Sequence, residues 1–407
     1  MRHTEPRRLV LYSHDTMGLG HTRRNLLIAQ ALSESRTQPA TLMVFGAGEA
    51  QAWDLPAGVE SLTLPAVRKA PNGGYASRRM PVSFDSLIRI RSQAIAGSIA
   101  AFDPDLVIVD KVPGGLAGEL LPTLRQLRRR GRARVVLGLR EVLDDPAAVR
   151  AEWTREDNYR ITRDCYDAIW VYGDRRVADD PEALGFGPEL RQRIHYTGYL
   201  DPLARNRRHP GNHPALAGIQ GRIALCLVGG GQDGAPLTRA FAAAPMPAGM
   251  TGVVVAGPQM PEAEYQATLA AAAGRLDLRV LRFVPDADAL IARADRVVAM
   301  GGYNTTIEIL AHERPALIVP RTTPRTEQLI RAERLAALGL IDVARPEAAG
   351  PEEIGRWLAA GTTPATAARR CLDFGGLNRV SLLARALTRP VRRARPAPRS
   401  HLVAVAG

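Results

Sequence analysis

The chain is almost devoid of lysine, has few cysteines and lacks long apolar runs. Lysine occurs only at Lys69 and Lys111, so arginine supplies nearly all of the positive charge behind the formal net charge of +13. This skew indicates a compositional bias of the genome as much as a functional demand. Cys165, Cys226 and Cys371 lie far apart in the sequence and form no CxxC pair. Their spacing excludes a structural zinc site and favours a reduced protein of the cytoplasm.

Three further classes of protein are disfavoured by what is missing: membrane-spanning, secreted and nucleic-acid-binding proteins. No segment has the roughly 18 or more consecutive apolar residues of a transmembrane helix, and the early apolar stretch RLVLY is too short for a secretory signal. No zinc finger, recognition helix or aromatic-rich basic sheet accompanies the positive charge, so nucleic acid is not an expected partner. The charge instead favours anionic partners such as nucleotides or lipid headgroups.

What the sequence does contain is an alternation of apolar strands and helical segments. Strands are expected at 8–14, 40–48, 105–110, 134–140 and 167–173, with helices at 22–35 and 83–102 among those between them. A second series of the same kind starts with the strand and glycine turn at 222–231. Continuous apolar strands interleaved with helices indicate parallel sheets covered on both faces. The sequence therefore predicts an α/β protein with two Rossmann-like halves.

The boundaries of these halves follow from composition. Residues 204–217 are rich in Pro, Gly, Arg and His without apolar periodicity, which is typical of a linker between domains. We therefore expect an N-terminal domain at 1–203 and a C-terminal domain at 218–377. A last helix is expected at 378–389, and the basic segment 390–407 is expected to be disordered.

Three glycine-rich turns follow predicted strands: MGLGH, VGGGQDG and MGGYNT. Such a turn at the carboxyl end of a parallel strand lets backbone amides and a helix N-terminus face a phosphate. The first turn lacks the third glycine and the acidic partner of a dinucleotide fingerprint, and the second lacks the Lys-Ser/Thr of a P-loop. Three turns shared between two halves indicate a ligand in the cleft between domains.

The segment 281–339 resembles the donor-nucleotide half of GT-B glycosyltransferases. It runs LRFVPDADALIARADRVVAMGGYNTTIEILAHERPALIVPRTTPRTEQLIRAERLAALG. It is most similar to the family of the peptidoglycan enzyme that adds N-acetylglucosamine to lipid I, a family 28-like glycosyltransferase. The resemblance covers about 120 residues of the C-terminal half, and in the N-terminal half it depends mainly on MGLGH. It implies two Rossmann-like domains facing each other across a cleft, with the acceptor on the N-terminal domain and a UDP-sugar on the C-terminal one.

The residues after MGG are expected to bind the donor's diphosphate. Their backbone amides and threonine hydroxyls lie at the positive end of a helix dipole. The resemblance implies that Glu308, farther along that helix, binds the ribose hydroxyls. The set is Gly301, Gly302, Tyr303, Asn304, Thr305, Thr306 and Glu308.

The resemblance also assigns the rest of the donor site. Glu327 and Gln328 match the pair that binds the hexose hydroxyls, although Thr322, Thr323 and Pro324 replace the family's usual His or aromatic residue just upstream. This departure leaves the identity of the sugar open. Val284 matches the position whose backbone recognises the base. The glycine loop that closes over the phosphates is matched by Gly229, Gly230, Gly231 and Gln232.

His21 is the candidate catalytic base. In the resembling enzymes the first glycine loop carries a histidine that faces the cleft. An inverting transfer needs a base to take the acceptor's proton, and imidazole, with an unperturbed pKa of about 6.5, suits that task. The alternative is a histidine that caps the helix or touches phosphate. Gly18, Gly20 and His14 belong to the same loop, and His14 is expected to pack or to position its neighbours.

No metal and no cofactor beyond the nucleotide sugar is expected. The DADAL stretch at 286–290 spells a DxD, but it stands at a helix start and matches a non-metal segment of the family. Two alternatives stay open: a UDP-sugar 2-epimerase or hydrolase on the same fold, and a non-catalytic nucleotide-sugar-binding protein.

The sequence does not identify the acceptor, and a lipid-linked intermediate, a polysaccharide and a small metabolite all stay open. The segments 70–81 and 124–134 are rich in arginine and can meet an anionic acceptor or an anionic membrane. The expected location is the cytoplasm, with peripheral contact at the inner face of the membrane.

Overall fold

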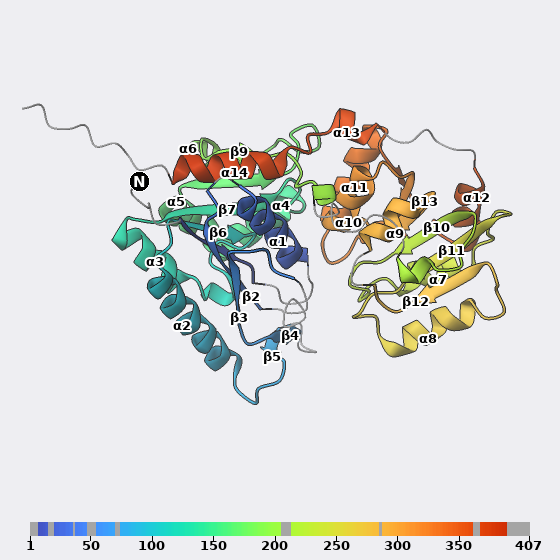
Figure 1. Cartoon of the computed structure of the whole chain (residues 1–407), viewed down its shortest axis with the longest axis horizontal. Helices are drawn as coiled ribbons and strands as arrows, with labels where there is room; N and C mark the ends of the chain where they lie inside the picture. Colours follow the sequence, from blue (N-terminus) through green and yellow to red (C-terminus); the bar gives the residue numbers. More distant parts are fainter. Residues whose placement is uncertain are drawn as a thin grey trace, which may run out of the picture.

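The chain forms two α/β lobes, each built on a parallel sheet with helices on both faces (Figure 1). The computed structural model describes residues 7–14, 20–35, 37–46, 54–69, 74–204, 213–284, 287–360 and 367–388. The predicted α/β class with two Rossmann-like halves is confirmed by these two sheets.

The N-terminal lobe has a seven-stranded parallel sheet in the order β3-β2-β1-β6-β7-β8-β9. Its strands are β1 (Arg8–Tyr12), β2 (Ala40–Phe45), β3 (Val59–Thr63), β6 (Leu106–Asp110), β7 (Arg134–Arg140), β8 (Ala168–Tyr172) and β9 (Ile194–Tyr196). Its helices are α1 (Gly20–Ser33), α2 (Phe84–Phe102), α3 (Leu121–Arg130), α4 (Pro146–Arg155), α5 (Asn158–Cys165) and α6 (Pro188–Arg191), and a hairpin adds β4 (Val67–Lys69) and β5 (Tyr75–Ser77). The strand order reverses between β1 and β6, so the loops after these strands diverge and form a crevice at the carboxyl edge.

The C-terminal lobe repeats this plan with six parallel strands in the order β12-β11-β10-β13-β14-β15. Its strands are β10 (Arg222–Leu227), β11 (Met250–Val255), β12 (Leu278–Leu281), β13 (Arg296–Ala299), β14 (Ala316–Ile318) and β15 (Asp342–Val343). Its helices are α7 (Ala235–Ala243), α8 (Glu262–Ala271), α9 (Asp288–Arg293), α10 (Tyr303–Ala311), α11 (Glu327–Ala337) and α12 (Pro351–Ala359). Here the order reverses between β10 and β13, and a predicted glycine turn follows each of these strands.

The apolar runs of the sequence become strands because both of their faces are covered. In β1, Leu9 and Leu11 join one apolar core, whereas Val10 and Tyr12 join the core on the other face of the sheet. Side chains alternate between the faces of a strand, so a strand buried on both sides is apolar throughout.

The described end of the chain returns to the N-terminal lobe. After α13 (Ala368–Cys371), α14 (Gly376–Leu387) packs against α1, and Figure 1 shows it lying along the first lobe. Residues 205–212 of the predicted linker and the predicted tail at 390–407 lie outside the described residues. None of the helices in the described part of the chain is long and apolar enough to cross a membrane.

Candidate active site between the two lobes

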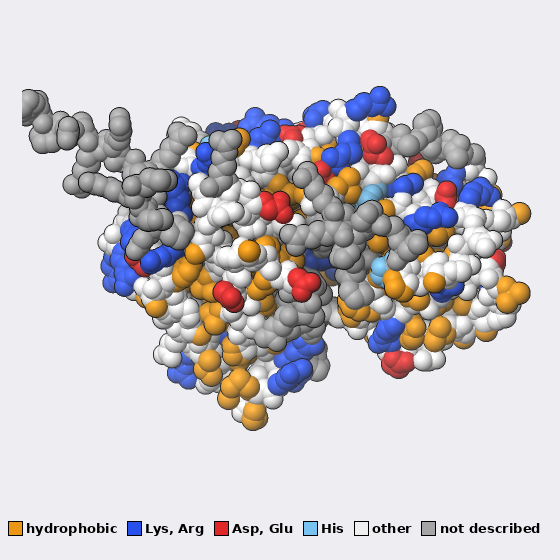
Figure 2. Space-filling view, in the orientation of Figure 1, with side chains coloured by type: hydrophobic (Ala, Val, Ile, Leu, Met, Phe, Trp, Pro, Cys, Tyr) orange, Lys and Arg blue, Asp and Glu red, His pale blue; other side chains and the backbone are white. Residues whose placement is uncertain are grey.

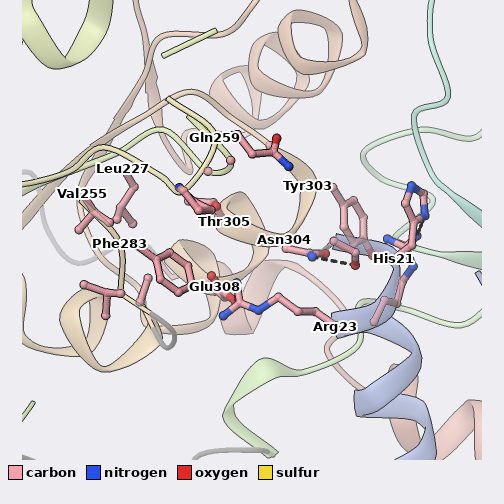
Figure 3. A pocket seen from close by; sticks show the side chains of 18 of the residues that line it. His21, Arg23, Leu227, Val255, Gln259, Phe283, Tyr303, Asn304, Thr305 and Glu308 are labelled. Carbon is pink, nitrogen blue, oxygen red and sulfur yellow. Dashed lines mark hydrogen bonds and ion pairs between the residues drawn. The ribbon is translucent and has the colours of Figure 1, made fainter. Parts of the chain in front are cut away.

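A cavity of about 300 Å³ lies where the carboxyl edges of the two sheets meet. Figure 3 shows His21 and Arg23 reaching it from α1 and the remaining labelled side chains reaching it from the C-terminal lobe. Its lining residues are Gly20, His21, Arg23, Arg24, Arg140, Leu227, Gly229, Gly230, Val255, Pro258, Gln259, Phe283, Val284, Ala287, Gly302, Tyr303, Asn304, Thr305 and Glu308.

The N-terminus of α10 faces this cavity. Gly302, Tyr303, Asn304 and Thr305 form its first turn and line the cavity. The preceding Gly301 has a φ of 73°, and a Cβ there would lie 2.7 Å from Ile318 Cγ2, so only glycine permits this approach. The free amides and the dipole of the helix make this end suitable for a diphosphate. Gly301 and Thr306 were predicted for the same site, but neither lines this cavity, and Thr306 is buried.

The glycine loop after β10 covers the same region from the other side. Gly229 and Gly230 line the main cavity and also an adjoining cavity of about 290 Å³, which Gln232 and Thr305 line as well. Gly231 has a structural role, because its φ is 89° and a Cβ would lie 2.2 Å from Ala256 O. The loop therefore presents its backbone to a ligand only through its earlier part.

An apolar wall and an acid complete the donor side. Leu227, Val255, Phe283 and Val284 line one end of the cavity, and the Phe283 ring is 45% exposed, so it can stack on a planar base. Glu308 lies in the second turn of α10 and is buried, with its Oε1 3.6 Å from Nη1 of Arg23. A carboxylate in this position can accept two hydroxyl hydrogen bonds.

Glu327 and Gln328 begin α11 and are held by one arginine. The backbone N of Arg321 donates to Gln328 Oε1 at 3.0 Å, and Arg321 Nη2 donates to Glu327 Oε1 at 3.1 Å. Glu327 Oε2 is buried and has no hydrogen-bond partner among the described atoms, whereas Gln328 lines the adjoining cavity. Glu327 itself lines neither cavity, so of this predicted pair only Gln328 reaches one of them.

His21 lies opposite α10 and is bound to a carboxylate that the sequence analysis did not select. The helix α1 begins at Gly20, earlier than the predicted start at residue 22, so His21 lies in its first turn. His21 Nδ1 is 2.6 Å from Oδ2 of Asp110, at the end of β6, and Asp110 is 1% exposed. Arg24 donates to the same carboxylate, with Nη2 at 2.8 Å from Oδ1 and 2.6 Å from Oδ2.

These contacts bear on the tautomer of His21. Burial by itself raises the pKa of Asp110, but the charges and hydrogen bonds of Arg24 and His21 outweigh it and lower that pKa well below its usual value. Asp110 is therefore ionised and can accept the proton of Nδ1–H, while Nη2 of Arg24, which can only donate, also lies 2.9 Å from Nδ1. With Nδ1 protonated, Nε2 of His21 carries the lone pair, the form that a general base requires.

His14 is a neighbour of this pair. Its ring centroid is 5.0 Å from that of His21, it does not line the main cavity, and its Nδ1 is buried without a hydrogen-bond partner. Burial, followed by the charges of His21 and Lys111, lowers the pKa of His14 well below its usual value, so it is neutral. Gly18 of the same predicted loop lies outside the described residues.

The lobes contact each other directly beside the cavity. Asn304 Nδ2 donates to Gly20 O at 3.0 Å, and the Tyr303 hydroxyl donates to Tyr172 O at 2.6 Å. The helix α1, which carries His21, and the helix α10 are thereby joined. The residues predicted on the two lobes therefore face the same cavity.

Candidate metal ligands are not gathered anywhere in the described ranges. These contain no group of three or more His, Cys, Asp or Glu residues that could bind a metal ion. Of the DADAL stretch, Asp286 is not described, and Asp288 begins α9 with its Oδ1 2.9 Å from Nε2 of His312.

Several residues of this region were not predicted: Arg23, Arg24, Arg140 and Phe283 line the cavity, and Asp110 contacts His21 without lining it. Asp110 carried a usable signal, since an acid that ends a buried parallel strand lies at the functional edge of the sheet. The arginines gave no signal that could have singled them out, because arginine is abundant throughout the chain.

Comparison with known proteins bears on this site. Residues 225–364 match the model of the glycosyltransferase family 28 C-terminal domain. A curated relative from Acidithiobacillus ferrooxidans (strain ATCC 53993 / BNL-5-31) is 27% identical over 289 residues, which are 62% of this chain and 76% of the relative. Its name is UDP-N-acetylglucosamine--N-acetylmuramyl-(pentapeptide) pyrophosphoryl-undecaprenol N-acetylglucosamine transferase.

Solved structures are similar over nearly the whole chain. The calicheamicin glycosyltransferase CalG4 has a TM-score of 0.60 at 18% identity, covering 97% of this chain and 100% of that one. A putative UDP-N-acetylglucosamine 2-epimerase from Listeria monocytogenes has a TM-score of 0.66 at 14% identity, covering 93% and 95%. At these identities the structures establish the fold, while the domain match and the curated relative establish the class of enzyme. The chain is therefore a glycosyltransferase of GT-B fold, and its residues 225–364 match the family 28 C-terminal domain.

Proposed function

We propose that the protein transfers a sugar from a nucleoside diphosphate donor, a UDP-sugar, to an acceptor hydroxyl with inversion and without a metal ion. The observation that carries this proposal is that His21, oriented by Asp110, lines the same cavity as the N-terminus of α10. A base on one lobe thus faces a diphosphate-binding helix on the other.

The reaction follows from this opposition. Nε2 of His21 takes the proton of the acceptor hydroxyl, whose oxygen forms the new bond to the anomeric carbon. The bond from that carbon to the diphosphate oxygen breaks on the opposite face, which inverts the configuration. The negative charge that develops on the leaving diphosphate is stabilised by the amides and dipole of α10. Asp110 stabilises the imidazolium that forms.

The donor's other parts have matching surfaces. The uracil ring fits against Phe283 with the backbone at Val284, and the ribose hydroxyls reach Glu308. The hexose extends toward Gln328, which lines the adjoining cavity, and toward the neighbouring Glu327. The 2-epimerase among the structural neighbours shares the fold, but the base proposed here is suited to an external acceptor.

A lipid-linked acceptor at the inner face of a membrane is supported by the surface near α2. Tyr75, Met80, Val82 and Ile90 are exposed apolar side chains there. The exposed arginines interspersed with them are Arg78, Arg79 and Arg89. Figure 2 shows hydrophobic and basic side chains together at the lower tip of the N-terminal lobe. Such a mixture suits anionic headgroups and the acyl region beneath them, and the curated relative's name includes an undecaprenol acceptor.

The test is release of UDP from candidate UDP-sugars by the purified protein with and without acceptor. Acceptor-dependent release, unchanged by EDTA and yielding a product of inverted anomeric configuration by NMR, supports the proposal. Release without any acceptor favours an epimerase or hydrolase. Donor binding without turnover in every acceptor mixture favours a binding protein.

A further inference from the structure

Three arginines line the cavity between the lobes, and they differ in whether a carboxylate accompanies them. Arg23 Nη1 lies 3.6 Å from Oε1 of Glu308, and Arg24 is paired with Asp110. Arg140, the last residue of β7, forms no ion pair with any of the described residues, and its Nε is buried without a hydrogen-bond partner. Within the described chain, Arg140 is thus the lining arginine whose charge no contact neutralises.

The environment of Arg140 opposes its charge. Burial, followed by the charges of Arg24 and Arg331, lowers the pKa of Arg140 to about 10, and the weaker attractions of Glu327 and Asp110 do not offset this. The side chain still carries its charge at neutral pH. A charge removed from water without a partner lowers the stability of the folded state, and such groups are concentrated at functional sites.

Arg140 and the N-terminus of α10 share one cavity. Gly302, Tyr303, Asn304 and Thr305 line it together with Arg140. The guanidinium carbon of Arg140 is 5.9 Å from the ring centroid of Tyr303. Because β7 belongs to the N-terminal lobe and α10 to the C-terminal lobe, an anion at this end of α10 would have a cation of the opposite lobe close by.

A second cavity that Arg140 lines is unsuited to an anion. It has a volume of about 230 Å³, and four carboxylates also line it: Glu141, Asp144, Asp145 and Asp180. The cavity between the lobes is lined by three arginines and by one acid, Glu308. The balance of charge therefore favours an anion beside Arg140 in the cavity between the lobes.

We propose that Arg140 binds the diphosphate of the nucleotide sugar from the N-terminal lobe and stabilises it as the leaving group. This assignment rests on the proposed function and adds a catalytic residue to it. When the bond between the anomeric carbon and the diphosphate oxygen breaks, its electron pair passes to that oxygen. The guanidinium keeps its protons and donates hydrogen bonds to the oxygens that gain charge. It supplies the charge neutralisation that a bound divalent cation would otherwise give.

The test compares a ligand that has the diphosphate with one that lacks it. Isothermal titration calorimetry measures the binding of UDP, and ligand-observed NMR measures the binding of uridine. Arg140→Gln is expected to weaken UDP binding by about tenfold to a hundredfold, the usual effect of losing a hydrogen bond between charged groups. Uridine affinity should stay unchanged. Arg140→Lys keeps the charge and should restore part of the lost UDP affinity.

Stability and turnover give two further readouts. Arg140→Gln removes an unpaired buried charge, so the melting temperature of the ligand-free protein should stay the same or rise. Its kcat at saturating donor and acceptor should fall by roughly 10²–10³-fold, as when one donor to a developing negative charge is lost. Arg134→Gln, at an exposed position at the start of the same strand, is the matched control and should leave UDP affinity and kcat unchanged.

Each other outcome contradicts a specific part of the argument. Equal UDP affinity in Arg140→Gln and Arg134→Gln would overturn the proposal. A loss of UDP and uridine affinity alike, or a lower melting temperature without ligand, would show that Arg140 serves the structure instead. An unchanged UDP affinity with a raised KM for the acceptor alone would assign Arg140 to the acceptor. A wild-type protein that does not bind UDP would contradict the proposed function before any variant is compared.

Discussion

Arg331 on α11 and Glu141 after β7 form an ion pair across the two lobes, with Nε 2.8 Å from Oε1 and side chains only 1% and 0% exposed. Arg331 also donates from Nη2 to Val142 O at 3.2 Å, and its guanidinium carbon is 5.3 Å from the Tyr303 ring centroid. The pair thus lies beside Tyr303, which lines the cavity, and joins the N-terminal lobe to the C-terminal lobe.

Removing one member of this pair should destabilise the closed arrangement strongly. Arg331→Met leaves Glu141 buried without its partner, and we expect a loss of about 3–5 kcal/mol in the free energy of unfolding. Urea denaturation followed by circular dichroism measures this loss. Arg345→Met breaks the exposed pair with Glu333 and should cost less than about 1 kcal/mol. Equal effects of the two substitutions would contradict the structural role of the buried pair.

His21→Ala should lower kcat by roughly 10²–10⁴-fold, the usual contribution of a positioned base, with little change in UDP affinity. Asp110→Asn should also lower kcat, because the amide no longer fixes the Nδ1–H tautomer. Steady-state kinetics at saturating donor and acceptor measure both effects. His195→Ala, at an exposed position on β9, is the control, and His14→Ala is expected to be the milder change within the loop. Wild-type kcat in His21→Ala would remove the catalytic assignment but leave the fold and enzyme class intact.

Glu308→Ala should weaken UDP binding by about 1–3 kcal/mol, because the ribose hydroxyls lose a charged acceptor. Isothermal titration calorimetry with UDP measures the change, and the thermal stabilisation by UDP should fall with it. Glu347→Ala, at an exposed position between β15 and α12, serves as the control. Unchanged UDP affinity in a folded Glu308→Ala protein would refute the ribose assignment.

Lys111 should make stability depend on alkaline pH. Its pKa is about 8 in the folded protein and 10.5 in the unfolded chain, so between these values the unfolded chain binds more protons. The free energy of unfolding should therefore rise with pH across this window relative to the Lys111→Met variant. Denaturation curves of both proteins from pH 7 to about 10.5 test the slope. A difference between the two proteins that does not vary with pH would show that the lysine is not held in a buried, charge-disfavouring site.

The apolar and basic surface near α2 should bind anionic vesicles and release them at high salt. Met80→Ser with Ile90→Ser removes exposed apolar contacts and should reduce sedimentation with phosphatidylglycerol vesicles, while phosphatidylcholine vesicles bind weakly throughout. Leu382→Ser on α14 is the control, since this leucine is exposed on another face of the protein. Equal sedimentation of the surface variant and the control would argue against this membrane-contact surface.

The class of fold was predictable because its signal is local. Apolar runs such as LVIVD and AIWVY need only their own residues to indicate strands covered on both faces, and glycine turns after strands indicate phosphate-facing loops. That Glu308 and the GGYNT turn lie at one cavity was also predictable, since they lie within a few residues of one another on one strand–helix unit. What these patterns left open is which side chains reach the ligand and which, like those of Thr306 and Gly231, serve the packing.

The sequence by itself therefore determined the two-lobed α/β architecture, the glycine turns and the histidine at the mouth of the first helix. Only the tertiary structure decided that Asp110 contacts His21 from 89 residues away, that Arg331 is paired with Glu141 and that Arg140 Nε is buried without a partner among the described residues. The physical reason is that hydrogen bonding and charge pairing depend on distances of a few ångströms between strands far apart in the chain. In a sequence with so many arginines, spacing alone does not reveal which of them have a carboxylate within reach.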